Sequence, residues 1–242
     1  MPEPVLVAVA HGSADPRASA TIAELAALAR ERSPGLDLRT AFLGHAPPSL
    51  PQVMSTIEAD REVTVLPLLL TAAHHSKADI PRMLARTARP RVSYGATLGP
   101  HPRLLDALER RLVEADPGAD PAGTAVVLAA AGSSDPEANA TIARMAAQWQ
   151  ARTGWLAVRP AYASAAGPSP EAAVTGLLRD GAPRVVVATY LLAPGLFADR
   201  IRHAALAAGA SAVSPALGAC AEVADVMLDR FAQVVSTRRT AA

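Results

Sequence analysis

The sequence predicts an α/β protein made of two similar domains, each with a four-stranded parallel sheet covered by helices. Three observations predict this fold class. Residues 10–23 (AHGSADPRASATIA) recur as residues 130–143 (AAGSSDPEANATIA), and the likeness continues in step along both halves. In each half, apolar runs alternate with patterns of helical period. Hydrophobic residues make up 50% of the chain and charged residues 19%, which is enough apolar sequence for two packed cores.

The first half contains four expected strands. Val5–Ala10 and Val63–Leu70 are continuous apolar runs, as expected for parallel strands that are buried on both faces. Leu38–Phe42 and Val92–Tyr94 are shorter candidates. Apolar residues at helical spacing follow each strand: Ile22, Leu25, Leu28 and Ala29; Val53, Met54 and Ile57; Ile80, Met83 and Leu84; Leu104, Leu105, Leu108 and Leu112. This alternation predicts a flavodoxin-like sheet with right-handed crossovers, for which we expect the strand order 2-1-3-4.

The second half repeats these elements. Leu98-Gly99 reappears as Leu217-Gly218, and Asp106 and Arg111 are matched by Asp225 and Arg230. Between the halves lies a segment rich in Asp, Pro and Gly, which is typical of a linker. We therefore expect an N-terminal domain over residues 1–116, a linker over 117–123 and a C-terminal domain over 124–242.

Charge and cysteine content exclude several classes of protein. The 23 Lys and Arg residues nearly balance the 22 Asp and Glu residues, which argues against a nucleic-acid partner. The single cysteine, Cys220, excludes an intramolecular disulfide framework and a four-cysteine metal site. No apolar stretch approaches the roughly 20 residues of a membrane span, and the N-terminus lacks the features of a signal peptide. We expect a cytoplasmic monomer without a membrane partner.

Histidines follow the two strands that are expected at the centre of the first sheet. His11 comes directly after Val5–Ala10, and His74 and His75 come shortly after Val63–Leu70. In an open parallel sheet, ligands bind at the carboxyl ends of the strands where the strand order reverses, so His11 and one of the later pair should lie close together. Imidazoles suit a divalent first-row metal ion. Each histidine taken alone has an ordinary structural reading, as a hydrogen-bonded residue at the end of a strand.

The repeat separates these two readings. His11 aligns with Ala131, and His74-His75 align with Leu196-Phe197, although the surrounding loops are retained. A structural pair of histidines would be expected in both copies. The N-terminal half is therefore expected to carry the reactive site, and the C-terminal half is expected to be a degenerate partner.

Three segments resemble a known family: His11-Gly12-Ser13, LLLTAAHHSKADIP over residues 68–81, and Leu98-Gly99-Pro100-His101-Pro102. Over nearly the whole chain the sequence is similar to the class II chelatases of the CbiX/SirB group, in their two-domain form. This resemblance implies chelatase-type domains and insertion, without ATP, of a divalent metal into sirohydrochlorin, on the way to sirohaem or cobalamin. The metal (Fe²⁺, Co²⁺ or Ni²⁺) is then a substrate, and no organic cofactor is expected.

The resemblance also implies roles for single residues. His11 and His75 match the metal-binding and catalytic histidines of the family, whereas His74 falls at a variable position. Ser13, Arg17, Lys77 and Arg82 are candidates for binding the substrate, whose ring carboxylates need cationic partners. One position departs from the family: Gly44 stands where a carboxylate is common, and His45 follows it. On a regular strand the side chain of His45 would face away, so it could serve only if the chain has already turned.

Two other functions stay open at this point. A metal or tetrapyrrole carrier would use the same residues as an enzyme, so the sequence does not separate the two. A hydrolase with Ser13 as nucleophile beside His11 is the weaker alternative, because no G-x-S-x-G motif is present. Insertion requires a loosely held ion and groups that accept pyrrole protons, and imidazoles with a pKa of about 6.5 provide both.

Overall fold

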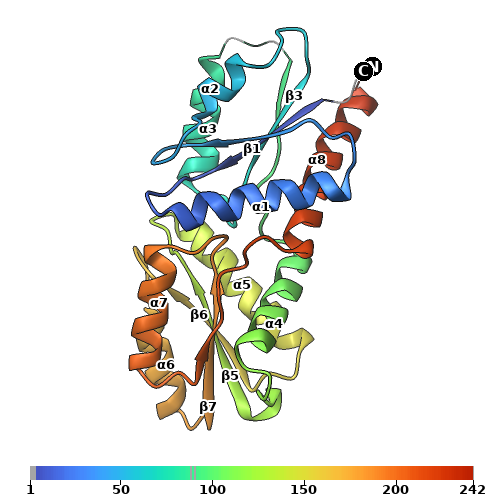
Figure 1. Ribbon diagram of the computed structural model, residues 1–242. Helices are drawn as coiled ribbons and strands as arrows, with labels where there is room; N and C mark the ends of the chain where they lie inside the picture. The colour runs from blue at the N-terminus through green and yellow to red at the C-terminus, as the bar shows by residue number, and fades with distance from the viewer. Residues whose placement is uncertain (1–3, 88, 90, 242) are drawn as a thin grey trace. The chain divides into compact units, whose positions relative to one another are not determined.

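The computed structural model describes residues 4–87, 89 and 91–241, and the chain divides into two compact units. Unit 1 lies within Met1–His101 and Ala219–Ala242, and unit 2 is Pro102–Gly218. Each unit contains one four-stranded parallel sheet (Figure 1). The strand orders are β2-β1-β3-β4 in unit 1 and β6-β5-β7-β8 in unit 2, so the expected fold class and order are confirmed.

Unit 1 is built around β1, whose six residues are all buried. Valines of β1 and β3 pack against apolar side chains of α2 and α3 on one face of the sheet, and α1 lies beside α8 on the other (Figure 1). The elements of unit 1 are β1 (Val5–Ala10), α1 (Pro16–Arg32), β2 (Leu38–Phe42), α2 (Leu50–Ser55), β3 (Val63–Pro67), a π-helical turn η1 (His75–Asp79), α3 (Ile80–Ala85), β4 (Val92–Tyr94) and α8 (Ala221–Ala241).

Unit 2 repeats this plan around β5, which is also buried along its whole length. Helices α6 and α7 pack side by side over an apolar face of the sheet. The elements of unit 2 are α4 (Pro102–Ala115), a short 3-10 turn η2 (Pro121–Gly123), β5 (Thr124–Ala130), α5 (Pro136–Arg152), β6 (Ala157–Tyr162), α6 (Pro170–Arg179), β7 (Arg184–Tyr190), α7 (Leu196–Ala207) and β8 (Ala212–Val213).

The compact units do not end where the sequence repeat ends. The expected boundaries, 1–116 and 124–242, assign α4 to the first domain and α8 to the second, whereas the structure places α4 in unit 2 and α8 in unit 1. The two helices are exchanged between the units. A repeat records the order of elements along the chain, but it does not record on which sheet a terminal helix packs.

Two arginines at equivalent repeat positions hold the exchanged helices. Arg111 of α4 donates two hydrogen bonds to the carbonyl oxygen of Leu217, at 2.9 and 2.7 Å. Arg230 of α8 donates to the carbonyls of Thr97, Leu98 and Pro100. Each guanidinium thus satisfies carbonyl groups in the Leu-Gly segment that precedes the other helix, and these charge-assisted bonds stabilise the exchange.

The segment after β3 also differs from its expected form. The strand ends at Pro67 and not at Leu70, and helical turns already begin at His75. The first of these turns is π-helical, because the amide of Ile80 donates to the carbonyl of His75 five residues earlier. Pro81 is the second residue of α3 and directly follows this turn. His75 therefore opens a helical segment and does not lie in a free loop.

The described residues, with positions 1–3, 88, 90 and 242 left aside, include no helix with both the length and the apolar character that crossing a bilayer requires.

Candidate functional site

His11 lies at the carboxyl end of the central strand of unit 1. It directly follows Ala10, the last residue of β1, and its side chain is exposed. Its Nδ1 is 3.0 Å from the carbonyl oxygen of Gly12. A carbonyl oxygen only accepts hydrogen bonds, so Nδ1 carries the proton and donates. The lone pair of Nε2 is then available for a ligand.

His75 carries a similar arrangement on the next segment. Its Nδ1 lies 2.7 Å from Oδ2 of Asp79, four residues later on the same helical segment. The ionised carboxylate accepts this hydrogen bond, so Nε2 of His75 also keeps its lone pair. The hydrogen bond with His75 is the largest cause that lowers the pKa of Asp79, and it outweighs the smaller, opposing effect of desolvation. Asp79 therefore stays ionised at pH values below the usual pKa range of an aspartate.

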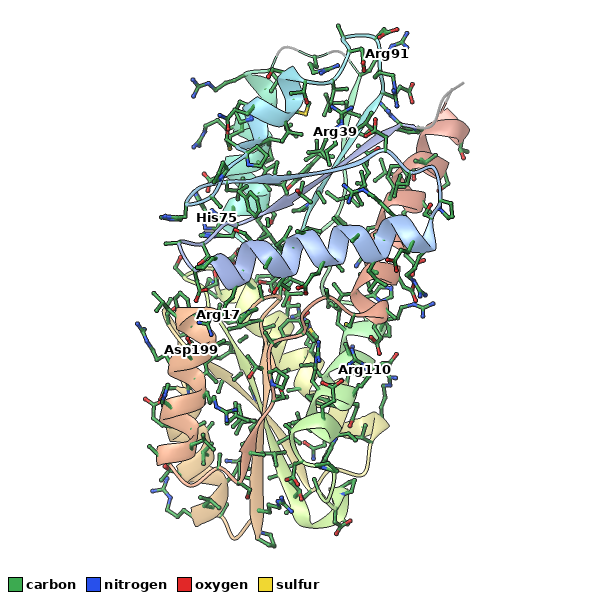
Figure 2. All side chains as sticks on the ribbon, in the orientation of Figure 1. Arg17, Arg39, His75, Arg91, Arg110 and Asp199 are labelled. Carbon is green, nitrogen blue, oxygen red and sulfur yellow. The ribbon has the colours of Figure 1, made fainter. Side chains whose placement is uncertain are left out.

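Hydrogen bonds within unit 1 hold the turn that carries His75. Ser76 is buried, and its hydroxyl donates to the carbonyl of Ala73 at 3.0 Å. The Tyr94 hydroxyl, at the end of β4, donates to the carbonyl of Ser76 at 2.8 Å. Partial burial raises the pKa of Tyr94 to about 12, so this donor keeps its proton. Figure 2 shows His75 near the end of α1 that carries Arg17.

The structure brings His11 and His75 together. Their ring centroids are 4.7 Å apart and the ring planes meet at 77°. A ring whose nitrogen binds an ion at about 2.0–2.1 Å has its centroid roughly 3.2 Å from that ion. Two such rings that bind one ion about 90° apart, measured at the ion, would have centroids about 4.5 Å apart. The observed separation fits a pair of adjacent ligands on a single ion.

The other two nearby histidines are placed differently. His74 lies 3.5 Å from Asp79 through Nε2, and its ring centroid is 6.2 Å from that of His75. The ring of His45 is nearly parallel to that of His11, with centroids 6.4 Å apart. Among the residues that the structure describes, no three side chains of His, Cys, Asp or Glu converge as a ready-made metal site. The closest pair of imidazoles is that of His11 and His75, which are therefore the candidate ligands.

The backbone around His11 is held to the loop after β2. The amides of Leu43 and Gly44 donate to the carbonyls of Ala10 and His11, at 3.0 and 3.2 Å. Gly12 has φ +87°, and a β-carbon there would overlap with the carbonyl oxygen of Gly44. Position 12 therefore requires glycine both for its conformation and for the close approach of the two loops.

Ser13 and Arg17 take part in the start of α1. The Ser13 hydroxyl oxygen accepts from the amide of Asp15 at 3.0 Å, and Asp15 caps the helix by accepting from the amide of Arg17. The exposed guanidinium of Arg17 also pairs with the Asp15 carboxylate at 2.6 Å. In unit 2 the amide of Asp135 donates to the Ser133 hydroxyl oxygen in the same way, so Ser13 has a structural role that is independent of the histidines.

Lys77 and Arg82 lie on the segment that carries His75. Lys77 is exposed within η1, and Arg82 is an exposed residue of α3 whose guanidinium is 3.9 Å from Asp79. With Arg17, they give the two segments that carry His11 and His75 three cationic side chains at the protein surface.

Sequence reasoning missed the role of Asp79 and the position of the His45 ring. Asp79 was assigned no role from the sequence, although its spacing of four residues from His75 in a helical segment was a usable signal. The sequence left open whether His45 faces away, as on a regular strand, or lies past a turn; β2 ends at Phe42 and the chain has turned by residue 45, where φ is +61°.

Both halves of the chain match a known protein family. A model of the CbiX family matches residues 5–115 and, a second time, residues 125–234. The chain belongs to the CbiX family. The double match coincides with the internal repeat, so both halves descend from the same type of domain.

Curated proteins that resemble this chain are named as sirohydrochlorin chelatases. The chain is 29% identical over 203 residues to a sirohydrochlorin cobaltochelatase of Priestia megaterium, covering 81% of this chain and 66% of that protein. It is 31% identical over 145 residues to a sirohydrochlorin ferrochelatase of Bacillus subtilis (strain 168), covering 58% of this chain and 55% of that protein. The matched part of the chain thus spans 66% of the length of the first relative and 55% of the second.

Solved CbiX-type structures share the fold. SirB from Bacillus subtilis with Fe³⁺ superposes with a TM-score of 0.84 at 24% identity, covering 98% of each chain. CbiX, described as the terminal enzyme for biosynthesis of siroheme in denitrifying bacteria, superposes with a TM-score of 0.74 at 23% identity, covering 96% of this chain and 99% of that one. These likenesses establish that the two-unit fold extends over nearly the whole chain.

Proposed function

We propose that this CbiX-family protein is a sirohydrochlorin chelatase, which inserts Fe²⁺, Co²⁺ or Ni²⁺ into the reduced tetrapyrrole without ATP. The observation that carries the proposal is the pair formed by His11 and His75, with ring centroids 4.7 Å apart at the carboxyl end of β1. The names of the relatives support the same substrate. The product would be sirohaem after insertion of iron, or a precursor of cobalamin after insertion of cobalt.

The metal ion is a substrate, so it must be released as well as bound. Nε2 of His11 and of His75 would hold it, because both Nδ1 atoms are engaged with Gly12 and Asp79. Two protein ligands leave positions for water and for the incoming ring nitrogens, whereas a closed set of four ligands would retain the ion. Both imidazoles are exposed, which gives a large flat substrate access to the ion.

Insertion breaks two pyrrole N–H bonds, and the two protons leave as the dipositive ion binds to the ring nitrogens. Each imidazole regains a free lone pair when it releases the ion, and at that moment it can accept one of these protons near neutral pH. Arg17, Lys77 and Arg82 would bind the peripheral carboxylates of the ring, and the Ser13 hydroxyl would donate a hydrogen bond. These groups orient the ring, while the histidines carry out the transfer.

The hydrolase alternative has little structural support. The Ser13 hydroxyl oxygen accepts from Asp15, and the ring of His11 is hydrogen-bonded to Gly12, so the two side chains do not form a nucleophile–base pair in the described residues.

The proposal is tested by incubating the protein with sirohydrochlorin and each of Fe²⁺, Co²⁺ and Ni²⁺ in the absence of oxygen. We expect the absorption spectrum of the metallated product to appear faster than in a protein-free control, without added nucleotide. The largest acceleration with Fe²⁺ would favour a role in forming sirohaem, and the largest acceleration with Co²⁺ a role in forming a precursor of cobalamin. Binding of sirohydrochlorin without any acceleration would replace the enzyme by a carrier.

Replacing Asp79 with asparagine is expected to weaken metal binding about 10- to 100-fold, the usual effect of losing a carboxylate that orients a ligating histidine. The amide no longer supplies the negative charge that supports the Nε2 lone pair of His75. The measurement is a calorimetric titration with Co²⁺ at neutral pH, where the lowered pKa of Asp79 keeps the wild-type carboxylate ionised.

Asp15→Asn is the matched control for this change. Asp15 is another ion-paired carboxylate of unit 1 with a lowered pKa, chiefly because of its hydrogen bond with Arg17, but it contacts no histidine. Asparagine also caps helices well. Asp15→Asn should keep Co²⁺ affinity within about twofold; equal affinities of Asp79→Asn and wild type would contradict the role of Asp79.

The cytoplasmic location, the monomeric state and the absence of an organic cofactor stay predictions from the sequence.

A further inference from the structure

One imidazole beside the histidine pair has no assigned role. The exposed ring of His45 lies 6.4 Å from that of His11 between centroids, and the two planes differ by only 19°. Its described surroundings give this ring no hydrogen-bond or ion-pair partner. An exposed imidazole without a protein partner has both nitrogens available, which distinguishes it from His74 and its contact with Asp79.

The backbone fixes where this side chain begins. Leu43 and Gly44 are hydrogen-bonded to the main chain of Ala10 and His11, so the loop after β2 is tied to the segment that carries His11. His45 then adopts a left-handed conformation, with φ +61°, which turns its side chain away from the alternation of the strand. Position 45 is thus held beside position 11 by main-chain contacts.

Unit 2 shows that this loop does not require histidine. Ala163 and Ser164 make the equivalent hydrogen bonds to Ala130 and Ala131, each at 2.9 Å. Ala165 adopts the same left-handed conformation, with φ +60°. The scaffold therefore brings these two positions together in both units, but imidazoles occupy them only in unit 1, where His75 is also present.

We propose that His45 is the third metal ligand, and that its exposed ring rotates to join His11 and His75 when an ion binds. This inference rests on the proposed function. Two rings on one ion can have centroids at most about 6.4 Å apart, so His45 already lies at the limit of reach. Rotation about its side-chain bonds closes the remaining gap, which accounts for the lack of a three-ligand group in the described residues.

Three neutral imidazoles would give the site a defined preference. Imidazole suits iron, cobalt and nickel, whereas carboxylate and water suit manganese and magnesium. Because the carboxylate of Asp79 is occupied by His75, it is not available to complete the shell. A ligand that joins by rotation can also leave by rotation, which favours transfer of the ion to a second set of nitrogens.

The experiment uses the full chain without tetrapyrrole and compares His45→Ala, His45→Asn and His74→Ala. Calorimetry measures Co²⁺ affinity, and pulsed EPR with Cu²⁺ counts the bound imidazoles. Both replacements at position 45 suit its backbone: Ala165 occupies the equivalent position, and asparagine tolerates the left-handed region. His74→Ala is the matched control because His74 is also an exposed imidazole beside the pair.

We expect three imidazoles in the wild type and in His74→Ala, and two in both variants at position 45, with Co²⁺ bound at least about tenfold more weakly. Wild-type affinity and an unchanged imidazole count in both His45 variants would overturn the inference. If His11→Ala and His75→Ala lower Co²⁺ affinity in that case, the proposed metal site stands without His45. If they too bind Co²⁺ as the wild type does, the proposed site itself fails.

Discussion

Replacing His11 with alanine is expected to reduce metal insertion to the rate of the spontaneous reaction. His11 supplies one of the two imidazoles that lie within reach of a single ion, so its loss leaves His75 without its neighbouring ligand. The fold should be unaffected, because the ring is exposed and Ala131 occupies the equivalent position in unit 2. We expect the free energy of unfolding to change by no more than about 0.5 kcal/mol, as for most surface substitutions.

Two titrations on each protein test this expectation: binding of sirohydrochlorin and insertion of Co²⁺. Sirohydrochlorin should still bind to His11→Ala, since its carboxylates contact cationic groups and not the imidazole. His203→Ala is the control, because His203 is an exposed histidine of unit 2 whose Nδ1 lies 2.7 Å from the carbonyl oxygen of Asp199 in its own helix. Insertion by His11→Ala at the wild-type rate would show that another group handles the metal.

The strand order of both units could be predicted from the sequence because it depends on local features. Apolar runs such as Val5–Ala10 mark the buried strands, and the helix-period segments between them require crossovers of one hand. The same reasoning placed His11 beside one of the His74-His75 pair at neighbouring strand ends, and in the structure the ring centroids of His11 and His75 are 4.7 Å apart. The family resemblance added which of the two adjacent histidines to choose.

The exchange of α4 and α8 could not be predicted in this way. The two halves are similar in sequence, so the pattern of apolar residues does not tell which sheet each terminal helix covers. In the folded chain the helices are held by hydrogen bonds across long sequence distances, such as those of Arg111 and Arg230 to loop carbonyls. Arginines that bind main-chain oxygens leave no periodic pattern in a sequence, so their partners become visible only in the folded chain.

The position of His45 shows a second limit. The alternation of side chains along a strand predicts the facing of each residue only while the strand continues. The chain leaves the strand after Phe42 and enters the left-handed region at residue 45, so the parity argument no longer applies there. Few non-glycine residues adopt that region, so the sequence alone left the turn at residue 45 as one of two possibilities.

Gly12→Ala is expected to lower the free energy of unfolding by about 2–4 kcal/mol, a large loss for a single substitution. The left-handed conformation at φ +87° costs an L-residue roughly 1–2 kcal/mol. In addition, the new β-carbon overlaps with the carbonyl oxygen of Gly44, so the loops must separate and the hydrogen bond from Gly44 to His11, worth about 1 kcal/mol, is lost. Unfolding in urea, followed by circular dichroism, measures the loss.

Two other glycines separate the causes of this effect. Gly35 has φ +88° but open space around its α-carbon, so Gly35→Ala should show only the conformational cost of about 1–2 kcal/mol. Gly132 has φ +83° and an equally close carbonyl at Ser164, so Gly132→Ala should destabilise the protein about as much as Gly12→Ala. Equal losses at positions 12 and 35 would show that the close approach of the loops contributes nothing.

Comparing Co²⁺ binding by Gly12→Ala and by Gly132→Ala also tests whether the backbone at Gly12 positions His11 for metal binding. When the loops at Gly12 and Gly44 separate, His11 is displaced from its position beside His75, so Gly12→Ala should also weaken Co²⁺ binding at least about tenfold in the fraction that remains folded. Gly132→Ala lies in the unit without the histidine pair and should bind Co²⁺ as the wild type does, despite a similar loss of stability. Because stability falls in both variants and metal affinity in one, the comparison assigns the metal site to unit 1 independently of any histidine substitution. Weakened binding in both variants would instead mean that global destabilisation, and not the spacing of His11 and His75, controls the affinity for the ion.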